Sequence, residues 1–559
     1  MSVFEQILAS RGLTGETREA FLHPDYAKGH DPFLLPDMQK AVERLVQARE
    51  RQEKIAIYGD YDIDGLTATT VLLDALEDFG FRFVTAFIPN RFVEGYGMTI
   101  DAVERIAADG AQLIITVDCG SLSEKEIIRA GELNVDVIVT DHHNVAPIQP
   151  PAVAVINPKR LLQEYPHEYE GYLLKKSSRK KLYPFLDLPG VGVAFKLVQA
   201  LQTRLDGLSM GQEKWLLDLV ALGTVCDVVT LVDENRTHVY WGLKVLSKTR
   251  RPGVKALMAV AGVEPERVNA RHLGFALGPR MNAAGRLETA QYALDMLTAR
   301  DGVAALEVAQ HLDKMNQARR ADQDMIYKAA ILQAEKYAND SVLVVSAPGW
   351  SHGIIGIVAA KLLEKFKKPT YVLEEMGGEA KGSARSYGDF SAADAIRASD
   401  DIITKGGGHK LAAGVTLPSA NISAFRERVN QYYRDQGYRL DEQQAALLPK
   451  ADATAPLTEI HEELIGQIAT LEPYGNGNPQ PIIKSERVVV VESRRMGGED
   501  QHIKLRLKQD DAELSLVAFN APDHFFVEPG EIVTVWYQPE INEWRGRRSV
   551  EGKLLHIEK

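Results

Sequence analysis

Acidic and imidazole side chains follow several apolar segments of this chain, at the points where parallel strands would end. They are Asp60, Asp62 and Asp64 after KIAIYG, Asp118 after LIITV, Asp141, His142 and His143 after VDVIVT, and Asp227 after ALGTVC. Carboxylates placed close together repel one another unless a cation lies between them. Mixed aspartate and histidine ligation suits Mn²⁺ or a similar ion better than Ca²⁺. The pattern therefore predicts a divalent-metal site outside the carboxyl ends of a parallel sheet.

Two simpler interpretations compete with this one. The series from Asp60 to Gly65 matches the start of an EF-hand calcium loop. Its twelfth position, however, holds Val71 rather than glutamate, and a strand pattern rather than a helix precedes it. A single aspartate at the end of a strand is most often a turn or helix cap. Several such groups in one sheet, one with a His-His pair, favour the metal site.

Strand and helix patterns alternate over the part of the chain that carries these acids, from KIAIYG to AVAVINP. The strands are nearly unbroken apolar runs, which is typical of a parallel sheet covered by helices on both faces. Helical patterns follow from Val191 to Val229, and residues 287–338 predict one or two long helices. These helices would form a connector to the next domain.

A second α/β pattern begins at SVLVVSAP and ends at GGGHKLAAGVTL. A polar, alanine-rich stretch at about 440–453 is typical of a linker. Short alternating strands with turn signals over 482–559 then predict a small all-β barrel. We therefore expect an α/β fold with a parallel-sheet domain, a helical connector, a second α/β domain and a barrel. Residues 1–40 are expected to form a short, partly irregular arm.

Glycine and basic residues form a second group of candidates, for binding an anion. The run Gly-Gly-Gly-His-Lys at 406–410 is expected in a turn, where consecutive backbone N–H groups converge on an anion. Further candidates are Ser383 and Arg385 in KGSARS, and Arg280, Asn282 and Arg286 in GPRMNAAGR. The alternative is that these glycines only make tight turns. Neither a Walker A motif nor a complete dinucleotide fingerprint is present, and PGVGVAFK at 189–196 lacks the third glycine of the latter.

The predicted barrel carries aromatic residues close to arginines. They are Phe519, Trp536, Tyr537 and Trp544, near Arg545, Arg547 and Arg548. Aromatic rings stack bases and arginines neutralise phosphates, which is how such barrels hold single strands. The same aromatics could equally form the barrel core, and both interpretations stay open.

Composition limits the class of protein. The chain has 559 residues, 45% of them hydrophobic and 25% charged, which predicts three or four folded domains, or two large ones. A net charge of −12 argues against a histone-like packing protein but leaves room for a local basic groove. Two cysteines, Cys119 and Cys226, exclude a disulfide framework and a cysteine zinc finger. They adjoin the acids, and we favour buried packing over metal ligation for them.

We see no signal-peptide pattern in this sequence, and no uninterrupted apolar run approaches the ~18–20 residues that a membrane span needs. We therefore expect a reducing cytoplasm as the default location.

The motifs GDYDIDG, VDCG, TDHH, GTVCDVV, GPRMNAAGR and GGGHKLAAG, in this order, resemble those of the bacterial RecJ family. This family comprises single-strand-specific 5′→3′ DNA exonucleases of the DHH phosphoesterase superfamily. The resemblance runs from about residue 38 to the end and includes PYGNGNPQP before the barrel. It implies a DHH catalytic domain at 41–285, a helical connector at 286–340, a DHHA1 substrate-binding domain at 341–440 and an OB-fold at 455–559.

The resemblance implies a site for two divalent ions, Mn²⁺ or alternatively Mg²⁺. Asp60, Asp62 and Asp118 would hold one ion, and Asp64, Asp118, His142 and Asp227 the other, with Asp118 bridging. His143 would lie beside the scissile phosphate. Many superfamily members have a histidine where this chain has Tyr58, so the first ion would rely on Asp60 instead.

The resemblance also implies residues that bind DNA. Arg91, Ser383 and Arg385 match positions that grip the 5′ end, while Arg280 and His409 would face phosphates in the cleft between the α/β domains. Asn282 is also expected to bind the substrate. The alternatives are that Arg91 caps a strand and that Arg385 lies on a solvated loop. The segment 164–184 departs from the family pattern, and its role stays open.

The activity implied is 5′→3′ hydrolysis of single-stranded DNA in recombinational and mismatch repair and in the restart of stalled forks. The implied partners are a single-stranded-DNA-binding protein and a RecQ-type helicase, with no membrane, for a monomer. Two alternatives remain. One is a DHH enzyme for short substrates, such as an oligoribonuclease, a cyclic dinucleotide phosphodiesterase or a pyrophosphatase, against which the barrel counts. The other is a non-catalytic single-strand-binding scaffold, against which the intact acidic motifs count.

Overall fold

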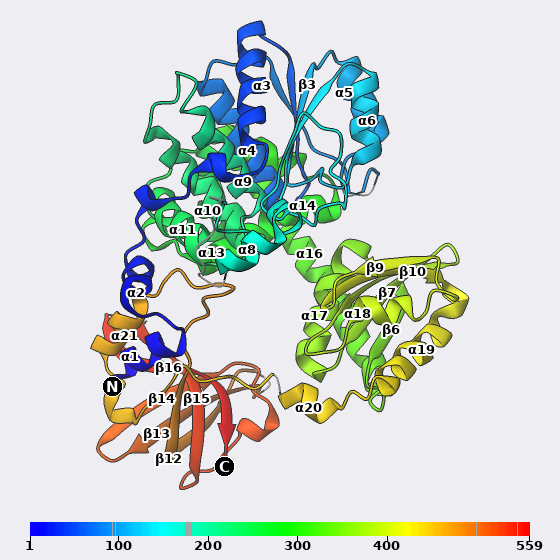
Figure 1. Ribbon diagram of the computed structural model, residues 1–559. Coiled ribbons are helices and arrows are strands. Elements are labelled where there is room, and N and C mark those ends of the chain that lie inside the picture. The colour runs from blue at the N-terminus through cyan, green and yellow to red at the C-terminus, as the bar shows by residue number, and fades with distance from the viewer. Residues whose placement is uncertain (92, 96, 174–181, 446, 499, 545) are drawn as a thin grey trace. The chain divides into compact units, whose positions relative to one another are not determined.

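The computed structural model describes residues 1–559 except 92, 96, 174–181, 446, 499 and 545 (Figure 1). The chain divides into two compact units, one formed by residues 1–313 and 451–559 and the other by residues 314–450. The segment 164–184, whose role the sequence left open, is helical at Pro166–Leu173. Its basic part, residues 174–181, lies outside the described residues. No helix among the described residues is long and apolar enough to cross a membrane.

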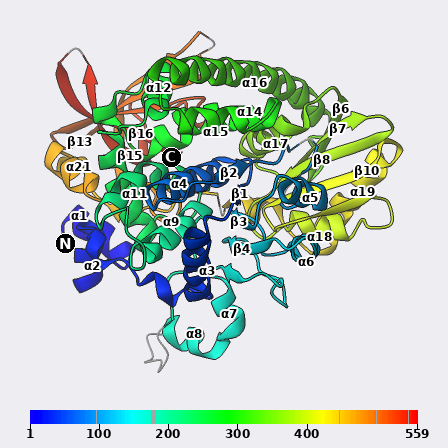
Figure 2. The same cartoon turned by 90° about the horizontal axis from the view of Figure 1, so that it is seen from above.

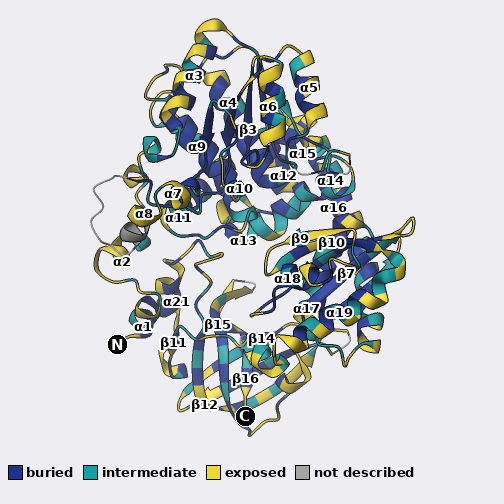
Figure 3. Cartoon of the chain, turned by 45° about the vertical axis from the view of Figure 1, so that its right-hand side comes forward, coloured by how far each residue is buried: buried dark blue, intermediate teal, exposed yellow. Residues whose placement is uncertain are grey.

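A five-stranded parallel sheet forms the centre of the first unit, in the order β2-β1-β3-β4-β5. Its strands are β1 (Ile55–Tyr58), β2 (Val84–Phe87), β3 (Leu113–Val117), β4 (Asp136–Thr140) and β5 (Ala154–Ile156). The strands β1, β3 and β5 are buried along their whole length, and Figure 3 shows this for β3. The chain passes from β2 on one side of β1 to β3 on the other, so the switch point at which such sheets bind ligands lies between β1 and β3.

Helices cover both faces of this sheet, as the continuous apolar strands predict. Figure 2 shows α5 (Ile100–Ala108) and α6 (Glu124–Glu132) on one side, with α4 (Ile63–Asp78) and α9 (Gly190–Leu201) on the other. The helix α4 is buried over most of its length although it contains three threonines. The hydroxyls of Thr67, Thr69 and Thr70 each donate to the carbonyl four residues earlier, so these three hydroxyls are satisfied within the helix.

Further helices complete the first unit. They are α3 (Met38–Arg51), α7 (Arg160–Glu164), α8 (Pro166–Leu173), α10 (Leu217–Cys226), α11 (Asp233–Leu246), α12 (Pro252–Ala261), α13 (Ala270–His272), α14 (Gly278–Leu287) and α15 (Gln291–Thr298). The helix α10 is apolar on all sides and is buried from Leu217 to Thr224. The predicted helical stretch 287–338 is present as α15 and the long α16 (Gly302–Lys336), which continues across the division between the units.

The N-terminal 40 residues differ from the partly irregular arm that the sequence suggests. They contain α1 (Val3–Ser10) and α2 (Gly15–Leu22), and the side chains of Val3, Phe4, Ile7 and Leu8 belong to the hydrophobic core of the barrel. This partner lies far along the chain, beyond residue 450, which explains why a local pattern could not reveal the packing.

The predicted barrel is confirmed as a six-stranded sheet in the order β11-β12-β13-β14-β16-β15, closed by pairing of β12 with β15. Its strands are β11 (Ala453–Thr454), β12 (Ile483–Met496), β13 (His502–Gln509), β14 (Ala512–Ala518), β15 (Ile532–Trp544) and β16 (Arg547–Glu558). The helix α21 (Glu462–Ala469) precedes β12. Closure removes the exposed strand edges that an open sheet would leave.

The second unit contains a five-stranded mixed sheet in the order β6-β7-β8-β10-β9. Its strands are β6 (Leu343–Pro348), β7 (Thr370–Met376), β8 (Glu379–Arg385), β9 (Lys405–Gly408) and β10 (Ala412–Pro418). Only β6 and β7 pair in parallel. Its helices, besides the end of α16, are α17 (His352–Phe366), α18 (Ala392–Arg397), α19 (Ile422–Asp435) and α20 (Leu440–Ala445).

The expectation that the glycines 406–408 lie in a turn is wrong. They form the edge strand β9 and pair with β10. A Cβ atom on Gly406 would lie 2.3 Å from Ile396 Cγ2, so glycine is needed here to let α18 pack directly on the strand. The turn consists of His409, Lys410 and Leu411 instead, and the glycine N–H groups are not arranged to converge on one anion.

Candidate metal centre

The ends of three strands and one helix bring the predicted acids together. Asp60 and Asp62 follow β1, Asp118 follows β3, His142 and His143 follow β4, and Asp227 caps the C-terminus of α10. Their ligand atoms form three groups in which all atoms lie within 4.8 Å of one another. The groups are Asp60, Asp62 and Asp118; Asp64, His142 and Asp227; and Asp118, His142 and His143.

The imidazole of His142 lies at the centre of this cluster. Its Nε2 atom is 3.0 Å from Asp118 Oδ1, 3.7 Å from Asp227 Oδ2 and 3.8 Å from Asp64 Oδ2. Burial lowers the pKa of His142 to about 3, so the ring is neutral and can offer a lone pair.

Three buried atoms test whether the cluster fits a cation. Asp60 Oδ1, His142 Nε2 and Asp227 Oδ2 make no hydrogen bond within the described part of the chain. A buried polar atom left in this state is costly unless something else satisfies it. Carboxylate oxygens and an imidazole nitrogen are a donor set that divalent ions such as Mn²⁺ accept. The residues present therefore fit a divalent cation.

The electrostatics of the carboxylates support the same conclusion. Burial, followed by repulsion from neighbouring carboxylates, raises the pKa of Asp60 to about 8, of Asp64 to about 7 and of Asp227 to about 9. The same causes raise the pKa of Asp118 well above its usual range. Without a cation, Asp60, Asp118 and Asp227 favour their protonated forms at neutral pH. A divalent ion would reverse that preference and displace the protons.

The loop after β1 explains why the acids have the spacing D-x-D-x-D-G. The Asp62 carboxylate caps α4 by accepting from the N–H groups of Asp64 (2.9 Å) and Gly65 (3.2 Å). A Cβ atom on Gly65 would lie 2.6 Å from the Asp60 backbone. The loop thus joins a strand to the helix that follows it, without the preceding helix of an EF-hand, so the EF-hand alternative does not apply.

The N-terminus of α9 orients Asp64, a role that sequence reasoning missed. Gly190 N and Val191 N donate to the two carboxylate oxygens of Asp64 at 2.6 and 2.8 Å. A Cβ atom on Gly190 would lie 2.6 Å from Asp118 Cβ, so only glycine fits between the two acids. The signal is present in the sequence as PGVGVAFK, but an incomplete dinucleotide motif does not indicate contact with a carboxylate.

Asp141 orients His143 and does not itself belong to the three ligand groups. Its Oδ1 accepts from the backbone N–H groups of His142 (2.7 Å) and His143 (3.0 Å) and lies 2.9 Å from His143 Nδ1. Its Oδ2 accepts from Ser121 N at 3.0 Å. Burial by itself would raise the pKa of Asp141 and lower that of His143. The hydrogen bond between these two side chains outweighs burial, so the pKa of Asp141 is lowered and that of His143 is raised.

Tyr58 and the two cysteines pack around the site. Tyr58 is buried, stacks on Phe87 and donates to Gly97 O at 3.0 Å, so it takes no place among the described ligand groups. The thiol of Cys119 is buried near Tyr58 O, and that of Cys226 near Leu273 O. Burial raises the pKa of both thiols, which agrees with packing rather than ligation.

Two basic residues that were not predicted as metal ligands contribute to the electrostatics of this site. Burial lowers the pKa of His142 and raises that of Asp227, and the positive charge of Lys159, which follows β5 in INPK, favours a lower pKa in both groups. Arg286 of α14, an anion-binding candidate from the sequence, partly opposes the rise that burial causes in the pKa of Tyr61. Lys159 stands just after another apolar strand pattern, so its position at the same sheet edge was readable from the sequence.

The DNA-binding candidates of the first unit lie in different environments. The Arg91 guanidinium lies 5.0 Å from the centre of the Tyr61 ring and partly opposes the rise that burial causes in the pKa of Asp60, so it lies near the carboxylates rather than merely capping β2. Arg280 pairs with Asp313 Oδ1 at 2.7 Å and donates to Ala276 O at 2.7 Å. Asn282 is half-buried in α14.

The candidates of the second unit centre on β8. Arg385 is half-buried on this strand, and its Nη1 donates to Ser383 Oγ at 3.2 Å and to Ala384 O at 2.8 Å. No ion pair of Arg385 occurs within the described residues, and burial lowers its pKa. The solvated-loop alternative is therefore wrong for Arg385. His409 is exposed in the β9–β10 turn.

Some aromatic residues of the barrel lie in its core, and others are exposed enough to stack on bases. Tyr537 is fully buried and hydrogen bonds with Ser485 Oγ at 3.0 Å, as a core residue does. Phe519 is 65% exposed, and Trp536 is half-buried with Lys484 Nζ 5.1 Å from its ring centre. Arg545 and the side chain of Trp544 lie outside the described part.

Three family models match this chain. They are the DHH family N-terminal domain over residues 54–224, the DHHA1 domain over 339–435 and the RecJ OB domain over 451–556. Among solved structures, the crystal structure of RecJ in complex with Mn²⁺ from Thermus thermophilus matches with a TM-score of 0.80 and 29% identity. That match covers 100% of this chain and 76% of the other.

Curated relatives named single-stranded-DNA-specific exonuclease RecJ match nearly the whole chain. The Bacillus subtilis protein is 37% identical over 97% of this chain, which spans 66% of that relative's length. The Escherichia coli protein is 33% identical over 98% of this chain and 94% of its own length. The Haemophilus influenzae protein is 32% identical over 94% of this chain and 92% of its own length. On these identities and coverages, and with all three domain types in the expected order, the chain belongs to the RecJ family.

Proposed function

We propose that this protein degrades single-stranded DNA from its 5′ end by metal-dependent hydrolysis of phosphodiester bonds. The observation that carries the proposal is the buried cluster of carboxylates around His142, whose unsatisfied atoms and raised pKa values fit divalent cations. Relatives named single-stranded-DNA-specific exonuclease supply the substrate class.

The ligands divide into two sets. We assign Asp60, Asp62 and Asp118 to one ion, and Asp64, Asp118, His142 and Asp227 to the other. Related proteins were solved with Mn²⁺ and with Mg²⁺, which supports either ion. Bound here, a pair of divalent ions supplies Lewis-acid activation of water and stabilises charge on the attacking and leaving oxygens.

The remaining residues would bind and orient the strand. His143, held through Nδ1 by Asp141, would donate to an oxygen of the scissile phosphate. Arg91 adds positive charge next to Asp60. Ser383 and Arg385 on β8 would grip a terminal phosphate, since a guanidinium pairs with two phosphate oxygens at once. Arg280, Asn282 and His409 are proposed as further contacts to the strand.

The barrel would hold the strand beyond the reacting phosphate. Phe519 and Trp536 offer ring faces for base stacking, and Lys484 lies beside Trp536. A long single strand is therefore favoured over dinucleotides as substrate, since a barrel adds nothing to binding of a substrate two nucleotides long.

The biological setting is proposed from the family. We place the protein in recombinational and mismatch repair, as a cytoplasmic monomer that acts with a single-stranded-DNA-binding protein and a RecQ-type helicase. The free thiols of Cys119 and Cys226 support a reducing compartment.

The test is digestion of single-stranded DNA labelled at either end, with Mn²⁺, with Mg²⁺ or with EDTA. We expect immediate release of a 5′ label, delayed loss of a 3′ label, and no reaction in EDTA. Duplex DNA of the same sequence serves as the control and should resist. Early release of the 3′ label would refute the direction, and full activity in EDTA would refute the metal site.

A further inference from the structure

The motif PYGNGNPQP, which precedes the barrel, lies against the loop that follows Asp227. Asn476 Nδ2 donates to Val228 O at 2.8 Å, and Asn476 O accepts from Leu231 N at 2.7 Å. We call residues 473–481, which carry this motif, the lead-in segment of the barrel. One residue of this segment, Asn476, therefore bonds to both ends of the loop 228–231. This loop begins immediately after a proposed metal ligand.

The backbone of this loop needs external support. Val228 has a φ of 63°, in the left-handed region that a β-branched residue rarely adopts. Such a conformation persists only where surrounding contacts impose it. On the side of the catalytic domain, Asp187 Oδ2 accepts from Thr230 N at 2.8 Å, and Asn235 Nδ2 donates to Thr230 O at 3.0 Å. Asn476 supplies the support for the two residues at the loop ends.

Two glycines allow the close approach of Asn476. A Cβ atom on Gly475 would lie 2.6 Å from Leu231 Cδ1, and one on Gly477 would lie 3.0 Å from Thr230 Cβ. Gly475 and Asn478 exchange backbone hydrogen bonds of 2.9 and 3.1 Å, which closes a tight turn around Asn476 and Gly477. Gly477 has a φ of 72°, which glycine adopts without strain. The turn therefore presents Asn476 at a defined position.

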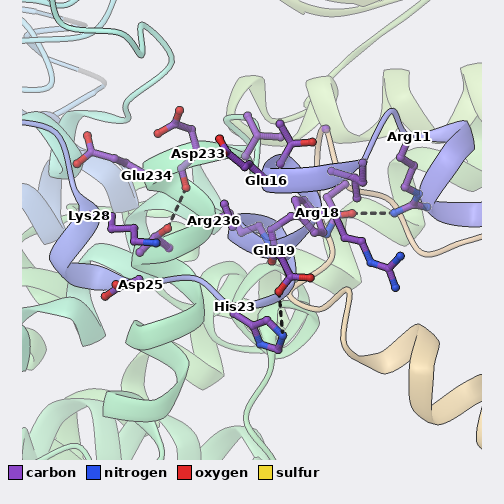
Figure 4. A pocket seen from close by; sticks show the side chains of 18 of the residues that line it. Arg11, Glu16, Arg18, Glu19, His23, Asp25, Lys28, Asp233, Glu234 and Arg236 are labelled. Atoms are coloured by element: carbon purple, nitrogen blue, oxygen red, sulfur yellow. Dashed lines mark hydrogen bonds and ion pairs between the residues drawn. The ribbon is translucent and has the colours of Figure 1, made fainter. Parts of the chain in front are cut away.

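The turn is joined to the catalytic domain through the residues that precede it. Asn478 Nδ2 donates to Leu471 O (2.8 Å) and Pro473 O (2.9 Å) within the same segment, and Asn478 is 2% exposed. Arg236 of α11, also 2% exposed, donates to Leu471 O and Glu472 O, both at 2.9 Å. A guanidinium placed on these carbonyls just beyond α21 complements the negative end of that helix. Arg236 lies at a pocket lined mainly by α2, α11 and the segment 477–479 (Figure 4).

Building on the proposed two-metal site, we propose that Asn476 is a positioning residue for Asp227. By fixing Val228 O and Leu231 N, it holds the loop in the conformation that aims the Asp227 carboxylate at His142. The lead-in segment of the barrel would then help to set the affinity of the ion bound by Asp64, His142 and Asp227. Asn476 acts through the backbone and touches neither metal nor DNA in this proposal.

The test is Mn²⁺ binding by the full-length protein without DNA, measured by titration calorimetry. Asn476→Ala removes the side-chain donor, and Asn476→Asp places an acceptor against Val228 O; both keep the bond from Leu231 N. We expect one of two Mn²⁺ ions to bind roughly three- to tenfold more weakly, as the loss of one neutral hydrogen bond implies. Asn476 is exposed, so both variants should melt near the wild-type temperature in EDTA. Asn339→Ala, at an exposed loop of the second unit, is the matched control and should bind Mn²⁺ normally.

Kinetics provide the second readout. At limiting Mn²⁺ both Asn476 variants should lose kcat, excess Mn²⁺ should restore it, and KM for DNA should stay unchanged. Wild-type Mn²⁺ affinity in both variants would overturn the positioning role, and so would a raised KM with normal Mn²⁺ affinity. If instead the wild-type protein bound no Mn²⁺, the proposed metal site would fail, and this inference with it.

Discussion

Replacing one carboxyl group of the metal centre by a neutral amide should stabilise the metal-free protein while abolishing its activity. We choose Asp227→Asn, because Asp227 carries a buried oxygen without a hydrogen bond in the described chain and a pKa raised to about 9 by burial and by repulsion from Asp64 and Asp62. The unfolded chain has a carboxyl pKa of about 3.9. Folding without metal at pH 7 therefore requires this group to take up a proton.

The magnitude follows from the difference in pKa. Protonating a carboxyl of pKa about 3.9 at pH 7 costs up to roughly 4 kcal/mol. Part of this cost arises from repulsion between Asp227 and the neighbouring acids, which share it, and the Asp227 side chain is 20% exposed. We therefore expect the asparagine variant to gain only about 1–2 kcal/mol in free energy of unfolding. This corresponds to a rise in melting temperature of roughly 2–5 °C for a domain of this size.

The pH dependence has a definite sign. Between pH ~4 and pH ~9 the folded wild-type group binds more protons than the unfolded one, so metal-free stability falls as pH rises. The asparagine variant lacks this contribution. Its advantage should be small at pH 5 and greatest near pH 9.

The assay is thermal unfolding in EDTA at pH 5, 7 and 9, repeated with Mn²⁺. Mn²⁺ should raise the melting temperature of the wild type by mass action and do so far less in the variant, which reverses their order. Asp400→Asn, an exposed aspartate of the second unit, is the matched control and should change little. If Asp227→Asn melts at or below the wild type in EDTA at pH 9, the repulsion argument is wrong.

Substitutions at four further positions test other parts of the protein. Asp118→Ala should leave less than a few per cent of the exonuclease rate, with DNA binding by filter retention nearly intact. Gly190→Ala should lower the rate at least tenfold and weaken Mn²⁺ binding in calorimetry, because its Cβ would lie 2.6 Å from Asp118 Cβ. Arg385→Ala should raise KM for 5′-phosphorylated DNA roughly tenfold, as a charge-assisted bond of ~1.5–3 kcal/mol implies, with a smaller effect on 5′-hydroxyl DNA and partial recovery in Arg385→Lys; an equal penalty for both ends would contradict end recognition. Trp536→Ala should weaken binding of long single strands by ~1–3 kcal/mol in a fluorescence titration while sparing kcat.

The acids of the centre could be located from the sequence because two local rules agree. Continuous apolar runs identify the buried strands β1, β3 and β4, and parallel strands place their carboxyl ends at one edge. Asp118 and His142, on neighbouring strands, are thereby brought to 3.0 Å. The barrel was predictable for a similar reason, since its short alternating strands have a period of two.

Features that depend on distant partners could not be predicted. The apolar stripe of α1 is visible in the sequence, but its partner in the barrel is not. Glycine favours turns, so the run 406–408 predicts a turn, whereas close packing of α18 on β9 is what requires Gly406. Gly190 stands in a partial phosphate-binding motif, although its actual neighbour is the side chain of Asp118.

The surroundings of Asp227 combine a feature that the local sequence determines with one that depends on a distant part of the chain. Its position at the end of the apolar α10 is a local property, readable from ALGTVC. The loop that follows is held on one side by Asp187 and on the other by Asn476, which lies far along the chain in the lead-in segment of the barrel. If Asp227 binds metal as proposed, its dependence on both supports would couple docking of the barrel to the chemistry of the DHH domain. The barrel and the DHH domain belong to the same compact unit, formed by residues 1–313 and 451–559.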